Sequence, residues 1–496
     1  MNDIVREVLT SRVYDVAQKT PLEKAQKLSR QLGAHVYLKR EDMQPVHSFK
    51  LRGAYNKICR LSEAEKQCGV IAASAGNHAQ GVALAAQKLG ISALIVMPRT
   101  TPAIKIDAVK AYGAELVLIG DNYSEAAEEC ARLVKQTKRV FIHPFDDPLV
   151  IAGQGTIGQE IIEQLPDVTH IFVPVGGGGL IAGIAHYVKA VRPDVMIIGV
   201  EPVDSAAMTK SLAKGERVTL KHVGIFADGV AVKQVGEHTF AAAQRLVDSC
   251  ITVTTDQICS AINDSYEAAR TILEPSGALA LAGLKTYPLP SEAHAVAICS
   301  GANVSFERLQ QIAERTLIGS GREALIAVTL PERPGAFLEF CDKIVGRRSI
   351  TEFSYRFRER NVAHVLAGIS VKDADDKAKL LAQMKTKGFD HVDLSNDEIA
   401  KEHVRHMIGG PGPGHNAEML YHVEFPERPG ALGEFLHTVG TQWNVTLFHY
   451  RSTASDIGRV LIGFETTDQK NLEERLDATG FEYTRAGNNP GLLLFS

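Results

Sequence analysis

The chain has 496 residues, of which 45% are hydrophobic, and its 54 basic and 58 acidic residues give a formal net charge of −4. This length predicts about three domain-sized units, and the balanced charge argues against a nucleic-acid-binding protein. No apolar run approaches the ~20 residues that span a bilayer, and the first residues lack the basic start and apolar core of a signal peptide. The seven cysteines are dispersed and form no Cys-x-x-Cys pair, so we expect a cytoplasmic protein with reduced thiols and no membrane span.

Up to about residue 320, short apolar runs alternate with helical patterns. We expect strands at residues 69–73, 93–97, 114–119, 139–142, 170–175 and 195–200, with helices after residue 76, from 102, near 123–134 and from 180. The alternation predicts an α/β fold with parallel sheets and helices on both faces. Ligands of such folds bind at the carboxyl ends of strands, where Ser74, Gly176 and Ser300 fall.

A lysine stands between an aromatic ring and an arginine in Ser48-Phe49-Lys50-Leu51-Arg52-Gly53. Burial or a neighbouring cation lowers the pKa of a lysine and frees an amine that can attack an aldehyde. The alternative is a surface lysine paired with Glu41 or Asp42.

Four consecutive glycines, Gly176, Gly177, Gly178 and Gly179, follow one apolar strand segment and precede an apolar helix from Leu180. Without side chains, their backbone N–H groups can converge at a helix N-terminus, whose partial positive charge favours an anion. The run therefore predicts a phosphate site, with a flexible turn as the alternative. It lacks the spacing of a dinucleotide fingerprint.

Two further motifs end apolar runs in the same part of the chain. Ser74, Ala75, Gly76, Asn77 and His78 precede a helix, and Cys299-Ser300-Gly301 follows the run at residues 295–298. Because Ser and Asn are common N-caps, a structural role for the first motif stays open. We expect His78 to be a packed, hydrogen-bonded histidine, and we predict no metal site, since His403 and His406 lie beside an expected linker.

The last part of the chain repeats itself. Residues 331–336, Pro-Glu-Arg-Pro-Gly-Ala, recur 95 positions later as residues 426–431, and Phe353 and Tyr355 match Phe448 and Tyr450. Each copy has the pattern strand, helix, strand, strand, helix, strand, which is typical of a ferredoxin-like unit. We predict a first domain at 1–318, duplicated units at 324–397 and 419–496, and linkers at 319–323 and 398–418.

The order of these motifs resembles the fold-type II enzymes that use pyridoxal 5′-phosphate, and the duplicated tail resembles ACT-like regulatory domains that bind amino acids. The degradative threonine dehydratases and the serine racemases share the first part but lack the tail. The chain is therefore most similar to the biosynthetic threonine dehydratases, over residues 10–318 and from 324 onward. This resemblance implies dehydration of L-threonine to 2-oxobutanoate and ammonia, with L-serine as a secondary substrate. A serine dehydratase or racemase, or a non-catalytic amino-acid sensor, remains the alternative.

The same resemblance implies roles for single residues. Lys50 would bind the cofactor covalently and then act as the base, Phe49 would pack near the cofactor ring, and Ser300 would face the pyridine nitrogen. Asn77 would bind the 3′-hydroxyl of the cofactor. The phosphate would lie on Gly176, Gly177, Gly178, Gly179 and Leu180, and the substrate carboxylate on Ser74, Ala75, Gly76, Asn77 and His78.

For the tail, the resemblance implies inhibition by isoleucine, opposition by valine, and a homotetramer. We predict that Tyr355 and Tyr450 line effector pockets between the two units. The alternatives are partly buried strand tyrosines, or a duplicated oligomerisation module without a ligand. The segment Glu274-Pro275-Ser276-Gly277-Ala278 resembles a family segment near the active site, but we expect it to be the start of a helix. The acidic residues near Asp228 are too few to predict a cation site.

Overall fold

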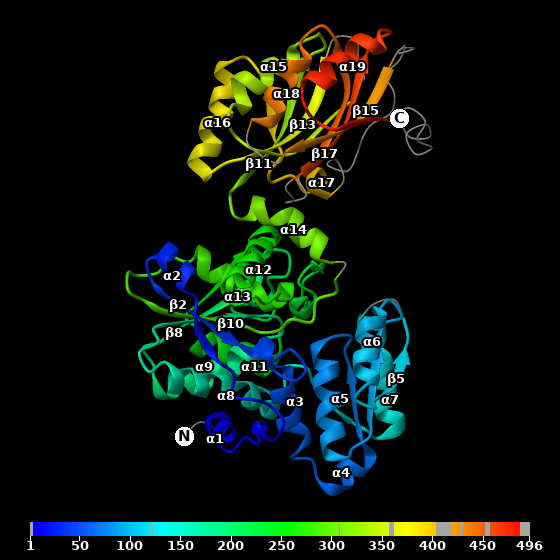
Figure 1. Ribbon diagram of the computed structural model, residues 1–496. Helices are drawn as coiled ribbons and strands as arrows, with labels where there is room; N and C mark the ends of the chain where they lie inside the picture. The colour runs from blue at the N-terminus through cyan, green and yellow to red at the C-terminus, as the bar shows by residue number, and fades with distance from the viewer. Residues whose placement is uncertain are drawn as a thin grey trace. The chain divides into compact units, whose positions relative to one another are not determined.

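The chain forms two compact units, Met1–Thr316 and Leu317–Ser496, each of which is described by itself (Figure 1). The computed structural model describes residues 3–120, 123–306, 308–356, 362–402, 418–426, 430–451 and 457–486. Most of the predicted linker at 398–418, with His403 and His406, lies outside the described residues, as do residues 427–429 of the second repeat motif.

The first unit contains a six-stranded and a four-stranded sheet. The six strands are, in spatial order, β1 (Leu22–Lys24), β2 (His35–Arg40), β10 (His294–Cys299), β7 (His170–Pro174), β8 (Met196–Pro202) and β9 (Ser249–Val253). The four strands are β5 (Glu115–Leu118), β4 (Ala93–Met97), β3 (Val70–Ala73) and β6 (Val140–Phe141). All neighbours are parallel except β1, which is antiparallel to β2.

Helices cover both faces of both sheets. They are α1 (Asp3–Leu9), α2 (Gln26–Leu32), α3 (Lys50–Ile58), α4 (Glu63–Cys68), α5 (Asn77–Leu89), α6 (Ala103–Lys110), α7 (Tyr123–Thr137), α8 (Pro148–Gln164), α9 (Gly179–Val191), α10 (Ala207–Lys214), α11 (Glu237–Leu246), α12 (Thr255–Ala269), α13 (Pro275–Thr286) and α14 (Arg308–Gly319). In β3, Val70 and Ala72 join the core that contains α3 and α5, whereas Ile71 and Ala73 join the core that contains α7. The predicted α/β class with parallel sheets is confirmed.

The sequence pattern missed β1, β2 and β9 of the six-stranded sheet. β2 lies inside the sheet, between β1 and β10, but it ends in the charged residues Lys39 and Arg40, which interrupt an apolar pattern. The other two missed strands lie at the edges of the sheet. β1 and β9 are only partly buried along most of their length, so they lack the continuous apolar run that marks a central parallel strand. The predicted strands in the sheet interiors agree with the structure to within two residues at each end.

The second unit is one antiparallel sheet of eight strands with helices packed on it (Figure 1). Its strands are, in spatial order, β14 (Asp390–Asp393), β11 (Glu323–Pro331), β13 (Val362–Ser370), β12 (Ile350–Arg356), β16 (Asn444–Arg451), β17 (Ile457–Glu465), β15 (Glu418–Pro426) and β18 (Tyr483–Arg485). Its helices are α15 (Ala336–Phe340), α16 (Ala374–Thr386), α17 (Glu398–Glu402), α18 (Ala431–Val439) and α19 (Gln469–Ala478). Chain order in each copy is strand, helix, strand, strand, helix, strand, so two ferredoxin-like units are confirmed.

The two copies share one sheet because β12 of the first copy pairs antiparallel with β16 of the second copy in the middle of that sheet. A single hydrophobic core runs under both copies, with Phe340 and Leu380 from the first copy and Phe435 and Leu472 from the second. Across the part of the chain that the structure describes, no helix has the length and apolar character needed to cross a bilayer.

Candidate active site

Lys50 is the first residue of α3, and the loop before it is tied to the end of β10. Ser48 forms an isolated antiparallel bridge with Gly301, and the Phe49 N–H donates to the Ser300 carbonyl at 3.2 Å. Lys50 Nζ donates to the Pro144 carbonyl at 3.0 Å and lies 5.3 Å from the centre of the Phe49 ring. Burial lowers the pKa of Lys50 to about 8, although the Glu274 carboxyl opposes this shift. Such an amine is a competent nucleophile near neutral pH.

The alternative of an ion-paired surface lysine does not hold. Glu41 pairs with Arg52, and Asp42 pairs with Arg40. Within the described part of the chain, Lys50 has no ion pair with either acid.

The glycine run turns from the end of β7 into α9. Gly178 has a φ of 94°, which only glycine adopts readily. A side chain at Gly177 would overlap the Phe145 ring, and Thr239 Oγ1 donates to the Gly177 carbonyl at 2.6 Å. Phe145 follows Pro144, so the segment that binds the Lys50 amine also packs against the glycine run.

The backbone of this run fits a phosphate group. Gly177, Gly178, Gly179 and Leu180 are buried, and among the described residues no acceptor bonds their N–H groups. Buried N–H groups without a partner cost free energy, and a helix N-terminus with free N–H groups is a ready anion site. The donor set therefore fits the phosphate of pyridoxal phosphate.

Asn77 begins α5, and its carboxamide bonds to two other side chains. Its Nδ2 donates to Glu274 Oε1 at 2.6 Å, and its Oδ1 accepts from Asn303 Nδ2 at 2.7 Å. Asn303 Nδ2 also donates to the Val46 carbonyl at 2.9 Å. The sequence pattern identified Asn77, but it gave no signal for the contact with Glu274.

Ser300 and the segment Ser74–Gly76 also lie at carboxyl ends of strands. Ser300 follows β10, is buried, and its Oγ donates to the Ser276 carbonyl at 3.3 Å. Ser74, Ala75 and Gly76 connect β3 to α5 and remain partly exposed, so their backbone is accessible to a small molecule.

His78 is buried, and its Nε2 donates to the Ile142 carbonyl at 2.9 Å. Burial, with help from the Lys50 charge, lowers the pKa of His78 to about 3. The imidazole is therefore neutral at physiological pH and suited to holding structure. Across the described residues, no group of three or more His, Cys, Asp or Glu side chains is placed to hold a metal ion.

A buried network of ion pairs anchors α3 through Arg52. Arg52 donates from Nη2 to Glu41 Oε1 at 2.7 Å and from Nη1 to Glu160 Oε1 at 2.6 Å. Lys39 Nζ donates to Glu160 Oε2 at 2.6 Å. All four side chains are fully buried, with two charges of each sign. Since Arg52 lies two residues after Lys50, this network fixes the first turn of α3.

Two pockets lie between the copies of the second unit. The Tyr355 pocket, of about 40 Å³, is lined by residues of both copies that include Glu332, Phe337, Leu338, Tyr355, Leu436, Trp443 and Asn444. The Tyr450 pocket, of about 170 Å³, is lined by residues that include Cys341, Arg348, Ser349, Leu432, Gly433 and Tyr450. Most of these residues are equivalent positions of the duplication.

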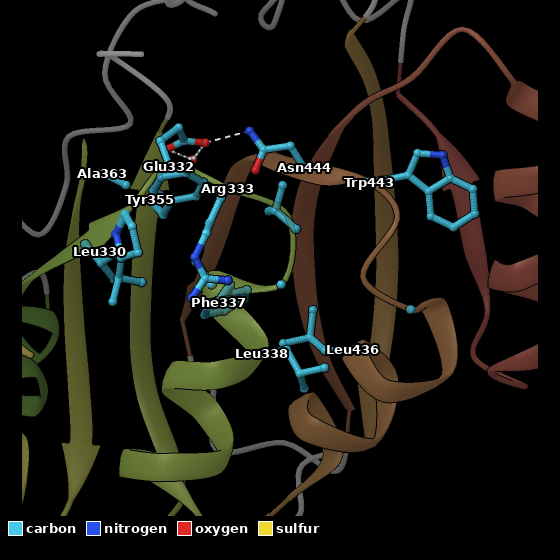
Figure 2. A pocket seen from close by; sticks show the side chains of 16 residues that line it. Leu330, Glu332, Arg333, Phe337, Leu338, Tyr355, Ala363, Leu436, Trp443 and Asn444 are labelled. Carbon is cyan, nitrogen blue, oxygen red and sulfur yellow. Dashed lines mark hydrogen bonds between the residues drawn. The ribbon is translucent and has the colours of Figure 1, made fainter. Parts of the chain in front are cut away.

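Figure 2 shows how Glu332 organises one end of the Tyr355 pocket. Its carboxylate accepts from Tyr355 Oη at 2.7 Å and from Asn444 Nδ2 at 2.6 Å. Leu338 of α15 and Leu436 of α18 lie together at the other end. The pocket thus joins a carboxylate to an apolar wall, which suits an amino acid with an aliphatic side chain.

Comparison with known proteins assigns both units. Residues 13–301 match the family model described as "Pyridoxal-phosphate dependent enzyme". Residues 314–404 and 411–495 match the model described as "C-terminal regulatory domain of Threonine dehydratase". Fold, lysine and glycine run thus define a pyridoxal-phosphate-dependent enzyme with a regulatory domain.

Individual relatives agree with the family models. The chain is 48% identical over 503 residues to the biosynthetic L-threonine dehydratase IlvA of Burkholderia multivorans, covering 100% of this chain and 99% of the relative. A solved structure of processed threonine deaminase isoform 2 from Solanum lycopersicum is 53% identical, with a TM-score of 0.62 over 63% of this chain and 92% of that one. Maize serine racemase is 34% identical, with a TM-score of 0.59 over 64% of this chain and 97% of that one. The chain belongs to the biosynthetic threonine dehydratase family.

Proposed function

We propose that the first unit eliminates water from L-threonine. The enamine that forms then tautomerises and hydrolyses, giving 2-oxobutanoate and ammonia. L-Serine would be a secondary substrate, because the methyl group that it lacks is worth only about 1–3 kcal/mol in a pocket. The observation that carries the proposal is the Lys50 amine, whose pKa is lowered to about 8 by burial, in a chain that resembles threonine dehydratases over its full length.

Each residue of the site would contribute a separate function. Bound pyridoxal phosphate supplies an aldehyde that holds the substrate amine and a conjugated ring that takes up electron density from the α-carbon. Lys50 Nζ would take the α-proton. Gly176, Gly177, Gly178, Gly179 and Leu180 would hold the phosphate through backbone N–H groups, and Phe49 would pack on the ring.

Ser300 and the Ser74–His78 segment would set the outcome of the reaction. The neutral Ser300 hydroxyl would face the pyridine nitrogen without protonating it, which favours prompt loss of the β-hydroxyl over transamination. Backbone N–H groups of Ser74, Ala75, Gly76 and Asn77 would hold the substrate carboxylate, with His78 packed beneath them.

The two pockets of the second unit would bind branched-chain amino acids, with isoleucine as inhibitor and valine opposing it. The Glu332 carboxylate offers a partner for an ammonium group, and the Tyr450 pocket has the larger volume. An effector acts by binding two states of the enzyme unequally, so each pocket must differ between those states.

We further propose that the protein acts in the cytoplasm as a homotetramer. None of the seven cysteines, all of which lie in the described part, is in a disulfide, which is consistent with a reducing compartment. Sedimentation of the purified protein would measure the number of subunits.

A substrate panel tests the proposed reaction. Purified protein loaded with pyridoxal phosphate should form 2-oxobutanoate from L-threonine faster than pyruvate from L-serine, and isoleucine should inhibit both. A serine racemase, which the similarity to the maize enzyme keeps as the second candidate, would instead form D-serine. A non-catalytic sensor would bind branched-chain amino acids and turn over neither substrate.

A further inference from the structure

Glu274 is a buried carboxyl group that the proposed chemistry leaves without a role. It occupies the N-cap position of α13, before Pro275, and is only 5% exposed. Its side chain does not cap the helix, since no N–H of α13 bonds to it. Within the described part of the chain, the carboxyl has no ion-pair partner. Burying such a group without a cation costs free energy, so it needs another explanation.

The Glu274 carboxyl accepts a hydrogen bond from Asn77. A carboxamide has two N–H donors and one carbonyl acceptor. For Asn77, Asn303 occupies the carbonyl and Glu274 accepts one of the two N–H groups. One Asn77 N–H is left, and its direction is fixed by the other two bonds.

The surrounding backbone is shaped around this pair. The Glu274 N–H donates to the Gly301 carbonyl at 3.2 Å, next to Ser300. A side chain at Gly301 would overlap Glu274 Oε1 and would come within 3.2 Å of Asn77 Nδ2. The glycine at position 301 therefore leaves the space in which the carboxyl and the carboxamide meet.

A carboxyl group suits this task in either protonation state. Burial raises the pKa of Glu274 to about 7, with the nearby Asp228 adding to the shift and the bond from Asn77 opposing it. Ionised or neutral, the carboxyl keeps an oxygen that accepts from an N–H group, so it holds the carboxamide in one orientation across the physiological pH range.

We propose that Glu274 is a positioning residue that holds the Asn77 carboxamide with its free N–H aimed at the 3′-oxygen of pyridoxal phosphate. The inference rests on the proposed contact between Asn77 and the cofactor. Glu274 would thereby set cofactor affinity and ring tilt without touching the substrate.

Cofactor binding to the apoprotein tests this positioning. Pyridoxal phosphate is titrated into wild type, Glu274→Ala, Glu274→Gln, Asn77→Ala and the Asn77→Ala/Glu274→Ala double variant, and the dissociation constant is read from the visible band. Losing a buried hydrogen bond should weaken binding about tenfold in each alanine variant. The double variant should bind no more weakly than Asn77→Ala, since Glu274 acts through Asn77.

Glu274→Gln keeps an acceptor oxygen and should bind the cofactor within about threefold of wild type. If thermal unfolding shows that Glu274→Ala has lost its fold, Glu274→Asp takes the place of Glu274→Ala in the test. Aspartate keeps the charge but withdraws the oxygen by one methylene, so it should bind about as weakly as Asn77→Ala. Unchanged affinity in Glu274→Ala or Glu274→Asp, or independent losses that multiply in the double variant, would overturn the inference. Failure of wild type to bind the cofactor at all would instead contradict the proposed function.

Discussion

Ser354 of β12 lies directly opposite His449 of β16, and these two residues are equivalent positions of the duplication, 95 residues apart. A local twofold axis therefore passes between Ser354 and His449 and relates the pair Tyr355–Phe448 to the pair Phe353–Tyr450. This symmetry gives the second unit two pockets built from the same positions. Each pocket is consequently a control for the other.

Exchanging one equivalent pair of residues should exchange the sizes of the two pockets. Leu338 lines the Tyr355 pocket, and its equivalent Gly433 lines the Tyr450 pocket. A Cβ at Gly433 would meet no atom within 4 Å, so Gly433→Leu should fold. Filling the pocket costs about 1–3 kcal/mol, which should weaken binding of its amino acid about tenfold or more in isothermal titration calorimetry.

Leu338→Gly is the matched variant, since it opens the Tyr355 pocket and leaves the Tyr450 pocket unchanged. It should keep the binding that Gly433→Leu loses. Equal effects of both variants on every branched-chain amino acid would show that neither pocket discriminates by size.

Tyr355→Phe should weaken inhibition by isoleucine. The substitution removes the O–H that donates to both oxygens of Glu332 at 2.7 Å and leaves the ring in place. Loss of one such bond costs about 1 kcal/mol, so the isoleucine concentration for half-inhibition should rise about fivefold. The kcat without effector should stay within about twofold, because the tyrosine lies in the second unit. Loss of that activity with intact isoleucine sensitivity would make the tyrosine purely structural.

The sequence was sufficient to predict both ferredoxin-like units, but not how they join. Each unit follows from apolar alternation and the 95-residue repeat, which are local patterns. The pairing of β12 with β16 joins an edge strand of one copy to an edge strand of the other. The sequence does not show which edge strands pair, because strands that carry Phe353 and Phe448 would have the same pattern if they remained unpaired.

In the candidate site, too, the residues that lie in local motifs could be predicted, whereas contacts between residues far apart in the sequence could not. Lys50, Asn77, the glycine run and Ser300 each lie in a motif with its own physical signature. Glu274 was expected to be the start of a helix, which it is, in a segment that resembles a family segment near the active site. No local pattern could predict its contact with Asn77, because the two positions are 197 residues apart. Phe145, which packs on Gly177, likewise has no local signal.

Acylation of the apoprotein should modify Lys50 at lower pH than exposed lysines. Burial lowers the pKa of Lys50 to about 8, so the free amine appears as pH rises through about 8. At pH 8 about half of Lys50 is free, on the order of a hundredfold more than for a lysine of ordinary pKa. Mass spectrometry after brief labelling measures this. A Lys50 profile that matches exposed lysines would contradict burial of the amine.

Arg52→Met should destabilise the first unit, since it leaves Glu41 and Glu160 buried with less compensation. Breaking a buried pair by removing one partner costs about 3–5 kcal/mol, which should lower the urea concentration of unfolding. Lys19→Met is the control, because its ion pair with Glu163 is about half exposed and should matter little. Equal midpoints for the two variants would show that the buried network does not stabilise the fold.

Borohydride reduction of the cofactor-loaded enzyme, followed by peptide mapping, tests most directly the claim that Lys50 carries the cofactor. Reduction makes the bond between the cofactor and its lysine permanent. We predict a single labelled peptide, modified at Lys50, and no labelled peptide from Lys50→Ala. Stoichiometric label on any other lysine of the wild-type chain would contradict the assignment of this active site.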